Sequence, residues 1–242
     1  MDDRKTHVLR AKPQMSIRTL ADYMAASDRA RRTVVRGCKF RPIARVVQHD
    51  EAKLAIASYL LSGASDPWAL SARADYIRNK HSEDQFEADL NQHNADYLDR
   101  FSSVAENTHF PKGAELRGAT SYAALNLNGV RVTFRPDLMV RRLTKMNVAR
   151  VGALMLRYQK GQKLPLKVAE YQSAAIHGVL AMHGVEPGEE VDKALCLILD
   201  AYTGTIFSAP GNAVTLFNNM KAACATISEG WQNIEPPPGA VV

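Results

Sequence analysis

The sequence is poor in the features that mark disulfide-rich, zinc-binding and membrane-spanning proteins. Its three cysteines are widely spaced and form no CxxC pair, which argues against a disulfide framework and a zinc site and favours reduced thiols in the cytoplasm. No apolar run approaches the roughly 20 residues of a membrane helix, and the charged first residues lack the apolar core of a secretory signal. Neither HExxH, GxxxxGK[ST] nor GxSxG occurs. The sequence therefore predicts a cytoplasmic protein without a membrane segment.

Acidic residues are also scarce in two stretches of the chain. Between Glu115 and Glu170 the only acid is Asp137, and none stands between Arg29 and Arg45. The net charge is only +6, so the uneven distribution rather than the total predicts a polyanion-binding surface. An acidic patch on a protein partner would fit the same charges, as would a solubilising face. The side chains that we expect to contact the phosphates of DNA are Arg29, Arg31, Arg32, Arg36 and Lys39.

Hydrophobic periodicity divides the chain into a helical first half and a mixed second half. Helices are predicted over residues 16–36, 50–61 and 68–101, with a break near 81–82, and later over 167–182 and from Asn212 or Asn218 to Trp231. Strands are predicted over 121–127 and 130–140, around an Asn128-Gly129 hairpin turn, and over 151–158, 194–201 and 205–208. Residues 151–158 are apolar on both faces, which indicates a central strand.

This order predicts an α/β fold with a mixed central β-sheet flanked by helices and a helical N-terminal region. We expect a flexible arm over residues 1–15, the helical region over 16–110, the α/β core over 111–234 and a flexible tail over 235–242. The proline-rich composition of that tail cannot continue a helix.

Polar residues in the second half have the spacing of a metal-dependent phosphodiesterase site. Asp137 follows Pro136 on the expected return strand of the hairpin, where burial would be costly without a partner or a metal; an ion pair with a neighbouring arginine would also satisfy it. Lys160 follows the next strand, but Tyr158 stands two residues before it, where an acid would be needed. In the other register Arg157 replaces the acid and Gln159 the lysine. Gln172 lies on the core-facing stripe of the next helix.

In these residues the chain resembles the PD-(D/E)XK nuclease superfamily, most of all its RecB-type branch, whose relatives include CRISPR-associated exonucleases. The resemblance covers roughly residues 82–231 by element order, and it implies a restriction-endonuclease-like fold with Mg²⁺ at the site. It makes Asp137 a metal ligand, Lys160 the catalytic lysine and Gln172 the residue that braces the site. Ile176 departs from the QxxxY pattern of the branch.

An upstream helix of such nucleases usually adds an acid or a histidine to the site. The candidates here are His81, Glu83, Asp84 and Glu87, of which Glu83 and Glu87 are our predicted additional metal ligands; a solvated helix face explains the same cluster. Neither register of the strand before Lys160 supplies a carboxylate, whereas Mg²⁺ needs several oxygen ligands to replace its hydration shell.

Three functions fit the sequence, in this order of preference. The first is a nuclease-like protein that binds DNA or a nucleoprotein partner without cutting, with Arg157, Lys160 and Gln172 lining the former catalytic cleft. The second is an active Mg²⁺-dependent DNA nuclease. The third is a regulatory module whose basic face binds an acidic protein.

Overall fold

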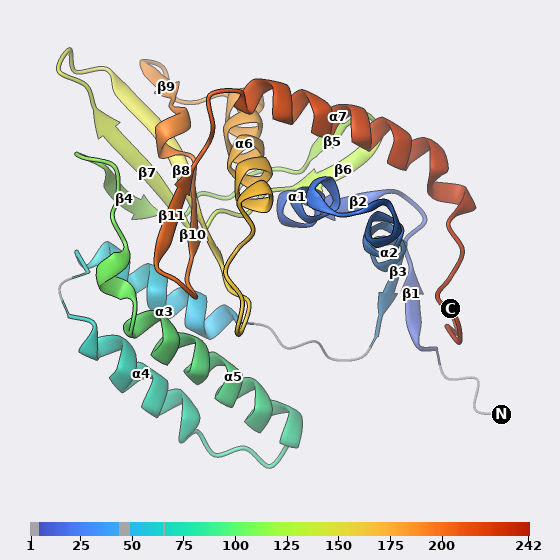
Figure 1. Cartoon of the computed structure of the whole chain (residues 1–242), viewed down its shortest axis with the longest axis horizontal. Helices are drawn as coiled ribbons and strands as arrows, with labels where there is room; N and C mark the ends of the chain where they lie inside the picture. The colour runs from blue at the N-terminus through green and yellow to red at the C-terminus, as the bar shows by residue number, and fades with distance from the viewer. Residues whose placement is uncertain (1–4, 44–48, 65) are drawn as a thin grey trace.

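The computed structural model describes residues 5–43, 49–64 and 66–242 (Figure 1). The α-helices are α1 (Ile17–Ala25), α2 (Asp28–Lys39), α3 (Asp50–Leu61), α4 (Trp68–Arg78), α5 (Gln85–Ser102), α6 (Leu166–His183) and α7 (Ala213–Gly230). The strands are β1 (His7–Leu9), β2 (Gln14–Ser16), β3 (Phe40–Pro42), β4 (Glu115–Gly118), β5 (Leu125–Leu127), β6 (Val130–Thr133), β7 (Leu138–Leu143), β8 (Ala149–Arg157), β9 (Glu189–Val191), β10 (Leu197–Asp200) and β11 (Thr205–Ser208). Three 3-10 turns complete the set: η1 (Ala105–Asn107), η2 (Lys193–Leu195) and η3 (Trp231–Asn233).

The main sheet is built around β8, the predicted central strand. Its strand order is β11-β10-β8-β7-β4, and β9 also pairs with β8. β7 runs antiparallel to β8, whereas β10 runs parallel to it and is reached through α6. All nine residues of β8 except Arg150 are buried, because helices cover both faces. The prediction of an α/β fold with a mixed sheet flanked by helices is confirmed.

Each face of the main sheet forms its own hydrophobic core. Ala153, Met155 and Ile198 pack with residues of α1, α6 and α7 on one face. The alternate residues Leu154 and Leu156 pack with α3, α4 and α5 on the other, as the two-residue period of a strand requires. Figure 1 shows the two helical groups on opposite sides of the sheet. This layering decides which side chains of β8 can share a site with residues of α3, α4 and α5, and which with residues of α1.

The Asn128-Gly129 hairpin lies in a second sheet. Asn128 and Gly129 have φ values of 47° and 87°, as a tight hairpin turn requires. However, β6 ends at Thr133 and pairs on its other side with β2, in the order β2-β6-β5. The expectation that residues 121–140 share one sheet with residues 151–158 is therefore wrong for the hairpin. It is correct only for the part within β7, which starts after Pro136.

The N-terminal residues are also paired, although a flexible arm was expected there. β1 pairs with β3, and β2 pairs with β6. The N–H groups of Thr6 and His7 donate to the Val241 carbonyl at 2.8 and 3.1 Å, so the residues before β1 lie beside the C-terminal residues (Figure 1). The helix predicted over 16–36 is divided into α1 and α2 at Ser27, which has an extended backbone. Arg45 lies outside the described residues.

Candidate functional site

Asp137 lies immediately before β7 and is hydrogen-bonded to the backbone of β8. Its N–H donates to the Leu154 carbonyl at 2.9 Å, and its Oδ2 accepts from the Leu156 N–H at 2.7 Å. Burial raises the pKa of Asp137, against the lowering effects of the Leu156 hydrogen bond and of Lys53 and Arg18. The carboxylate is thus held by the backbone in a partly desolvated position.

The side chains of Leu156 in β8 and of Tyr158 just after it face α3, α4 and α5 and carry no charge. Leu156 is 2% exposed and packs in the core formed with α3, α4 and α5. Tyr158 stacks on Tyr97 of α5 with ring centroids 4.0 Å apart and an interplanar angle of 13°. The Leu156 N–H that holds Asp137 thus belongs to an apolar residue, and neither Leu156 nor Tyr158 supplies a carboxylate that could share a metal with Asp137.

Residues of α1, α3 and α5 gather around Asp137 although no sequence motif marks them. His49 meets the rings of Tyr97 and Tyr158 edge-on, with centroids 5.4 and 5.7 Å apart. Burial raises the pKa of Tyr97 far above its usual value and lowers that of His49, so both are neutral at pH 7. Among the described residues neither the Tyr97 hydroxyl nor His49 Nδ1 has a hydrogen-bond partner. The Asp50 charge raises the pKa of Asp137.

Lys160, the predicted catalytic lysine, lies in the turn that follows β8 and is paired with a different acid. Its Nζ donates to Asp96 Oδ2 of α5 at 2.8 Å, and this hydrogen bond raises the pKa of Lys160. The charges that act on the Asp137 pKa are those of Lys53, Arg18 and Asp50. The structure thus connects Lys160 to α5.

Arg157 and Gln172 form a buried contact between the sheet and two helices. Arg157 Nε donates to Gln172 Oε1, its Nη1 donates to Asp22 Oδ2 of α1 at 3.1 Å, and its Nη2 donates to the Arg18 carbonyl at 3.0 Å. Burial, with the nearby Arg18 charge, lowers the pKa of Arg157 to about 10, so the guanidinium stays charged at pH 7. Each of the three guanidinium nitrogens of Arg157 donates to a partner inside the fold, so the structure gives this side chain a role in packing, and its contact with nucleic acid stays a prediction.

The two predicted upstream acids, Glu83 and Glu87, are exposed at the start of α5. Glu87 accepts a hydrogen bond from Ser82 Oγ at 3.2 Å. It precedes Asp96 by nine residues, which places it about 13 Å farther along the helix, toward the α4–α5 loop and away from the sheet (Figure 1). The structure therefore gives neither glutamate a contact with Asp137.

The described side chains around Asp137 do not fit a two-metal site. Within residues 5–43, 49–64 and 66–242, no group of three or more His, Cys, Asp or Glu side chains could hold a metal ion. Two-metal hydrolysis needs several carboxylates that converge on the ions. Asp137 instead accepts the N–H of Leu156, and Leu156 and Tyr158, the residue after β8, pack in the core with α3, α4 and α5.

The acid-free run from Arg29 to Arg45 lies partly in α2, and two of its cations, Arg31 and Lys39, stabilise the fold. Arg31 donates to the Tyr23 and Met24 carbonyls at the end of α1, at 3.1 and 3.2 Å. Lys39 is 7% exposed, and its Nζ donates at 2.8–3.0 Å to three carbonyls that follow α7, those of Trp231, Gln232 and Ile234. A cation at a helix C-terminus is favourable. These contacts occupy both side chains within the fold, and their contact with phosphates stays a prediction.

The remaining three arginines of α2 are available to a ligand. Arg29, Arg32 and Arg36 follow the i, i+3, i+7 pattern and therefore share one face of the helix. Arg29 and Arg32 are exposed and Arg36 is half-buried. In the described part of the chain none of the three forms an ion pair with an acid, and Arg36 Nε is buried without a hydrogen-bond partner. We call this face the arginine stripe.

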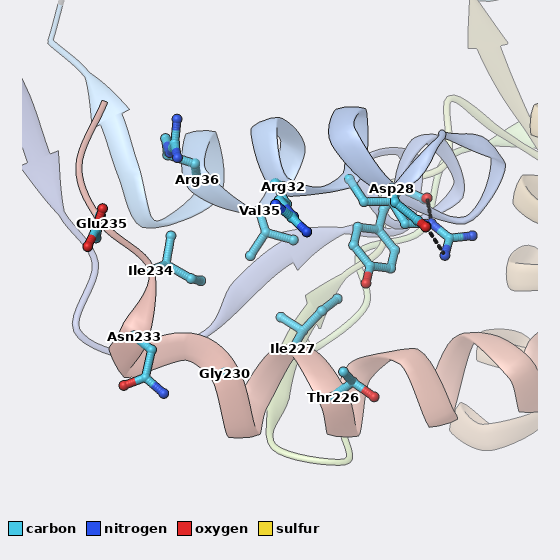
Figure 2. A pocket seen from close by; sticks show the side chains of 12 residues that line it. Asp28, Arg32, Val35, Arg36, Thr226, Ile227, Gly230, Asn233, Ile234 and Glu235 are labelled. Carbon is cyan, nitrogen blue, oxygen red and sulfur yellow. Dashed lines mark hydrogen bonds and ion pairs between the residues drawn. The ribbon is translucent and has the colours of Figure 1, made fainter. Parts of the chain in front are cut away.

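A groove of about 530 Å³ lies between the arginine stripe and the C-terminal half of α7. Its floor is apolar, formed by Val35 of α2, Ile227 of α7 and Ile234 after η3, and Arg32 and Arg36 stand at its α2 side (Figure 2). The residues that complete its lining are Tyr23, Asp28, Arg31, Thr226, Gly230, Asn233 and Glu235. Arg31 is paired with Asp28 at 3.4 Å, whereas Arg32 and Arg36 remain free for a ligand.

Comparisons with known proteins add no relative. No protein-family model matches the chain, and none of the curated proteins matches its sequence. None of the helices in the described ranges is long and apolar enough to cross a membrane.

Proposed function

We propose that the chain is a PD-(D/E)XK nuclease-like protein that binds DNA, alone or within a nucleoprotein complex, and does not cut it. The arginine stripe is the observation that carries the proposal. Three guanidinium groups on one helix face, without carboxylate partners among the described residues, form the kind of surface that neutralises phosphates. A cytoplasmic location belongs to the proposal, since the cysteines are free.

The strand order supports the nuclease-like part of the proposal. β4, β7 and β8 form an antiparallel run, α6 crosses over, and β10 then joins parallel to β8. An acid at the start of the second of these strands and a buried glutamine on the crossover helix agree with the resemblance found in the sequence. In this chain, however, Gln172 holds Arg157, so the former cleft is stabilised by side-chain contacts that need no metal.

The surroundings of Asp137 support the absence of cleavage. Its carboxylate accepts the backbone N–H of Leu156, and Leu156 and Tyr158, the residue after β8, pack in the core with α3, α4 and α5 and supply no carboxylate. Without several converging oxygen ligands, Mg²⁺ is not drawn out of its hydration shell.

An active Mg²⁺-dependent nuclease is the second candidate, and Asp50 is the observation that favours it. Asp50 opens α3 and acts on the pKa of Asp137, so a second carboxylate stands in its surroundings. This candidate requires cleavage that disappears when Asp137 is replaced by alanine.

Binding is tested by fluorescence anisotropy with labelled DNA between about 50 and 300 mM salt. We expect affinity to fall steeply with salt, and the variant Arg29→Gln/Arg32→Gln/Arg36→Gln to weaken binding and reduce the slope of log K against log[salt] by about 2–3. The matched control removes three exposed lysines elsewhere, Lys112→Gln/Lys145→Gln/Lys167→Gln. Equal effects of the two triple variants would mean that only net charge matters and would refute the stripe as the binding surface.

A further inference from the structure

The groove beside the arginine stripe differs chemically from a surface that only touches phosphates. Val35 and Ile227 are buried at 8% and 4% exposure and form a floor with Ile234, while Thr226 and Asn233 supply polar atoms at its edge. A volume of about 530 Å³ falls in the range of small-molecule sites, which are mostly apolar with a few polar groups. The groove thus offers an apolar surface and hydrogen-bonding groups directly beside two cations.

The charges around the groove favour a ligand that is anionic on one side and apolar on the other. At the α2 side, Arg32 and Arg36 have no carboxylate partner among the described residues, and Arg36 Nε is buried without a hydrogen bond. Of the two, Arg32 is exposed and can meet an anion directly. The carboxylate of Glu235 also belongs to the lining, at the same end as Ile234 (Figure 2).

We propose that the groove takes an unpaired nucleotide of a single-stranded nucleic acid. Its base lies on the floor of Val35, Ile227 and Ile234, and its flanking phosphates contact Arg32 and Arg36. This inference rests on the proposed function and names its substrate class. In a duplex the bases stay paired and stacked, so only the phosphates reach the arginine stripe. In a single strand each base can turn outward and lie against protein side chains, as bases do on aromatic rings, and the Tyr23 ring belongs to the lining of this groove.

Gly230 allows the groove to be blocked without disturbing the fold. It lines the groove at the end of α7, and a side chain added there would meet nothing within 4 Å. The variant Gly230→Leu therefore adds an apolar side chain to the groove lining while leaving Arg32 and Arg36 unchanged. Gly211→Leu is the matched control, because Gly211 also faces open space but does not line the groove.

The experiment measures binding by anisotropy at one salt concentration, with three labelled nucleic acids and one small competitor. They are a single strand, the duplex of the same sequence, a single strand with abasic sites, and a free nucleoside monophosphate as competitor. We expect wild type and Gly211→Leu to bind the single strand at least about fivefold more tightly than the duplex, as one base on an aromatic ring such as that of Tyr23 would provide. Gly230→Leu and the abasic strand should lose this preference, with duplex affinity unchanged.

The outcomes separate this inference from the proposed function. Equal affinity for single strand and duplex, or full affinity for the abasic strand, overturns the inference and leaves DNA binding by the arginine stripe intact. Displacement of the strand by the free monophosphate at comparable concentration would also overturn it, since the groove would then be a mononucleotide site. Absence of salt-dependent binding to either form removes the proposed function itself.

Discussion

Replacing Arg157 by methionine tests the assignment of this residue to the interior. The side chain is 8% exposed, and it donates to Gln172, Asp22 and the Arg18 carbonyl. Methionine fills much of the same volume but removes the charge and every donor. Gln172, which is fully buried, then loses the partner of its Oε1 atom.

The expected loss of stability depends on whether Gln172, Asp22 and the Arg18 carbonyl can find other hydrogen-bond partners. Removing one member of a buried charged pair typically costs about 3–5 kcal/mol. The Asp22 side chain is 40% exposed and can be rehydrated, so the free energy of unfolding should fall by about 2–4 kcal/mol. For a chain of this size that corresponds to a decrease in Tm of roughly 5–15 °C.

Thermal and urea unfolding of the variant measure this decrease, and anisotropy below its transition measures DNA binding. Arg32→Met is the control, because this exposed side chain should change stability by less than about 0.5 kcal/mol while weakening binding. We expect the two variants to show opposite patterns. An Arg157→Met protein of wild-type stability that fails to bind DNA would refute the interior role and return Arg157 to the binding surface.

Three further variants test other parts of the structure. Lys39→Met should lower the free energy of unfolding by about 1–3 kcal/mol in urea titration without weakening DNA binding, since three carbonyls lose their donor. Asp137→Asn should raise the free energy of unfolding at pH 7, because burial raises the Asp137 pKa and so disfavours the charged carboxylate. This gain in stability should shrink as the pH falls through the folded pKa toward the unfolded value near 3.8. A stability difference that does not depend on pH would contradict this cause. Gly178→Ala should destabilise by about 1–3 kcal/mol in thermal unfolding, because its Cβ would lie 2.2 Å from the Phe217 ring.

Local patterns predicted most of the helices and the central strand. Asp50 to Leu61 is one helix as expected, and the two-sided apolar run became β8. The Asn128-Gly129 turn formed because its backbone requirement is local. The sheet that β6 joins depends instead on β2, more than 110 residues earlier in the chain, and no local pattern contains that pairing.

The candidate site was harder to predict because charge does not reveal burial. Lys39 and Arg29 occur in the same acid-free run, yet Lys39 bonds carbonyls about 190 residues later in the chain while Arg29 faces solvent. Asp137 was found from Pro136 and the lack of other acids. His49 and Tyr97 came to lie near it through the packing of α3 and α5, which no spacing in the sequence encodes.

The central claim, DNA binding without cleavage, is tested most directly by one paired measurement on the wild-type chain. Labelled single- and double-stranded DNA are incubated with the protein in Mg²⁺ and in Mn²⁺, with binding followed by anisotropy and cleavage by denaturing gel, beside Asp137→Ala and Tyr158→Glu. We predict salt-dependent binding by wild type and by Asp137→Ala alike, with intact DNA in both metals; cleavage that appears only in Tyr158→Glu would agree with a carboxylate lost at that position. Robust wild-type cleavage that Asp137→Ala abolishes would contradict the account and identify an active nuclease.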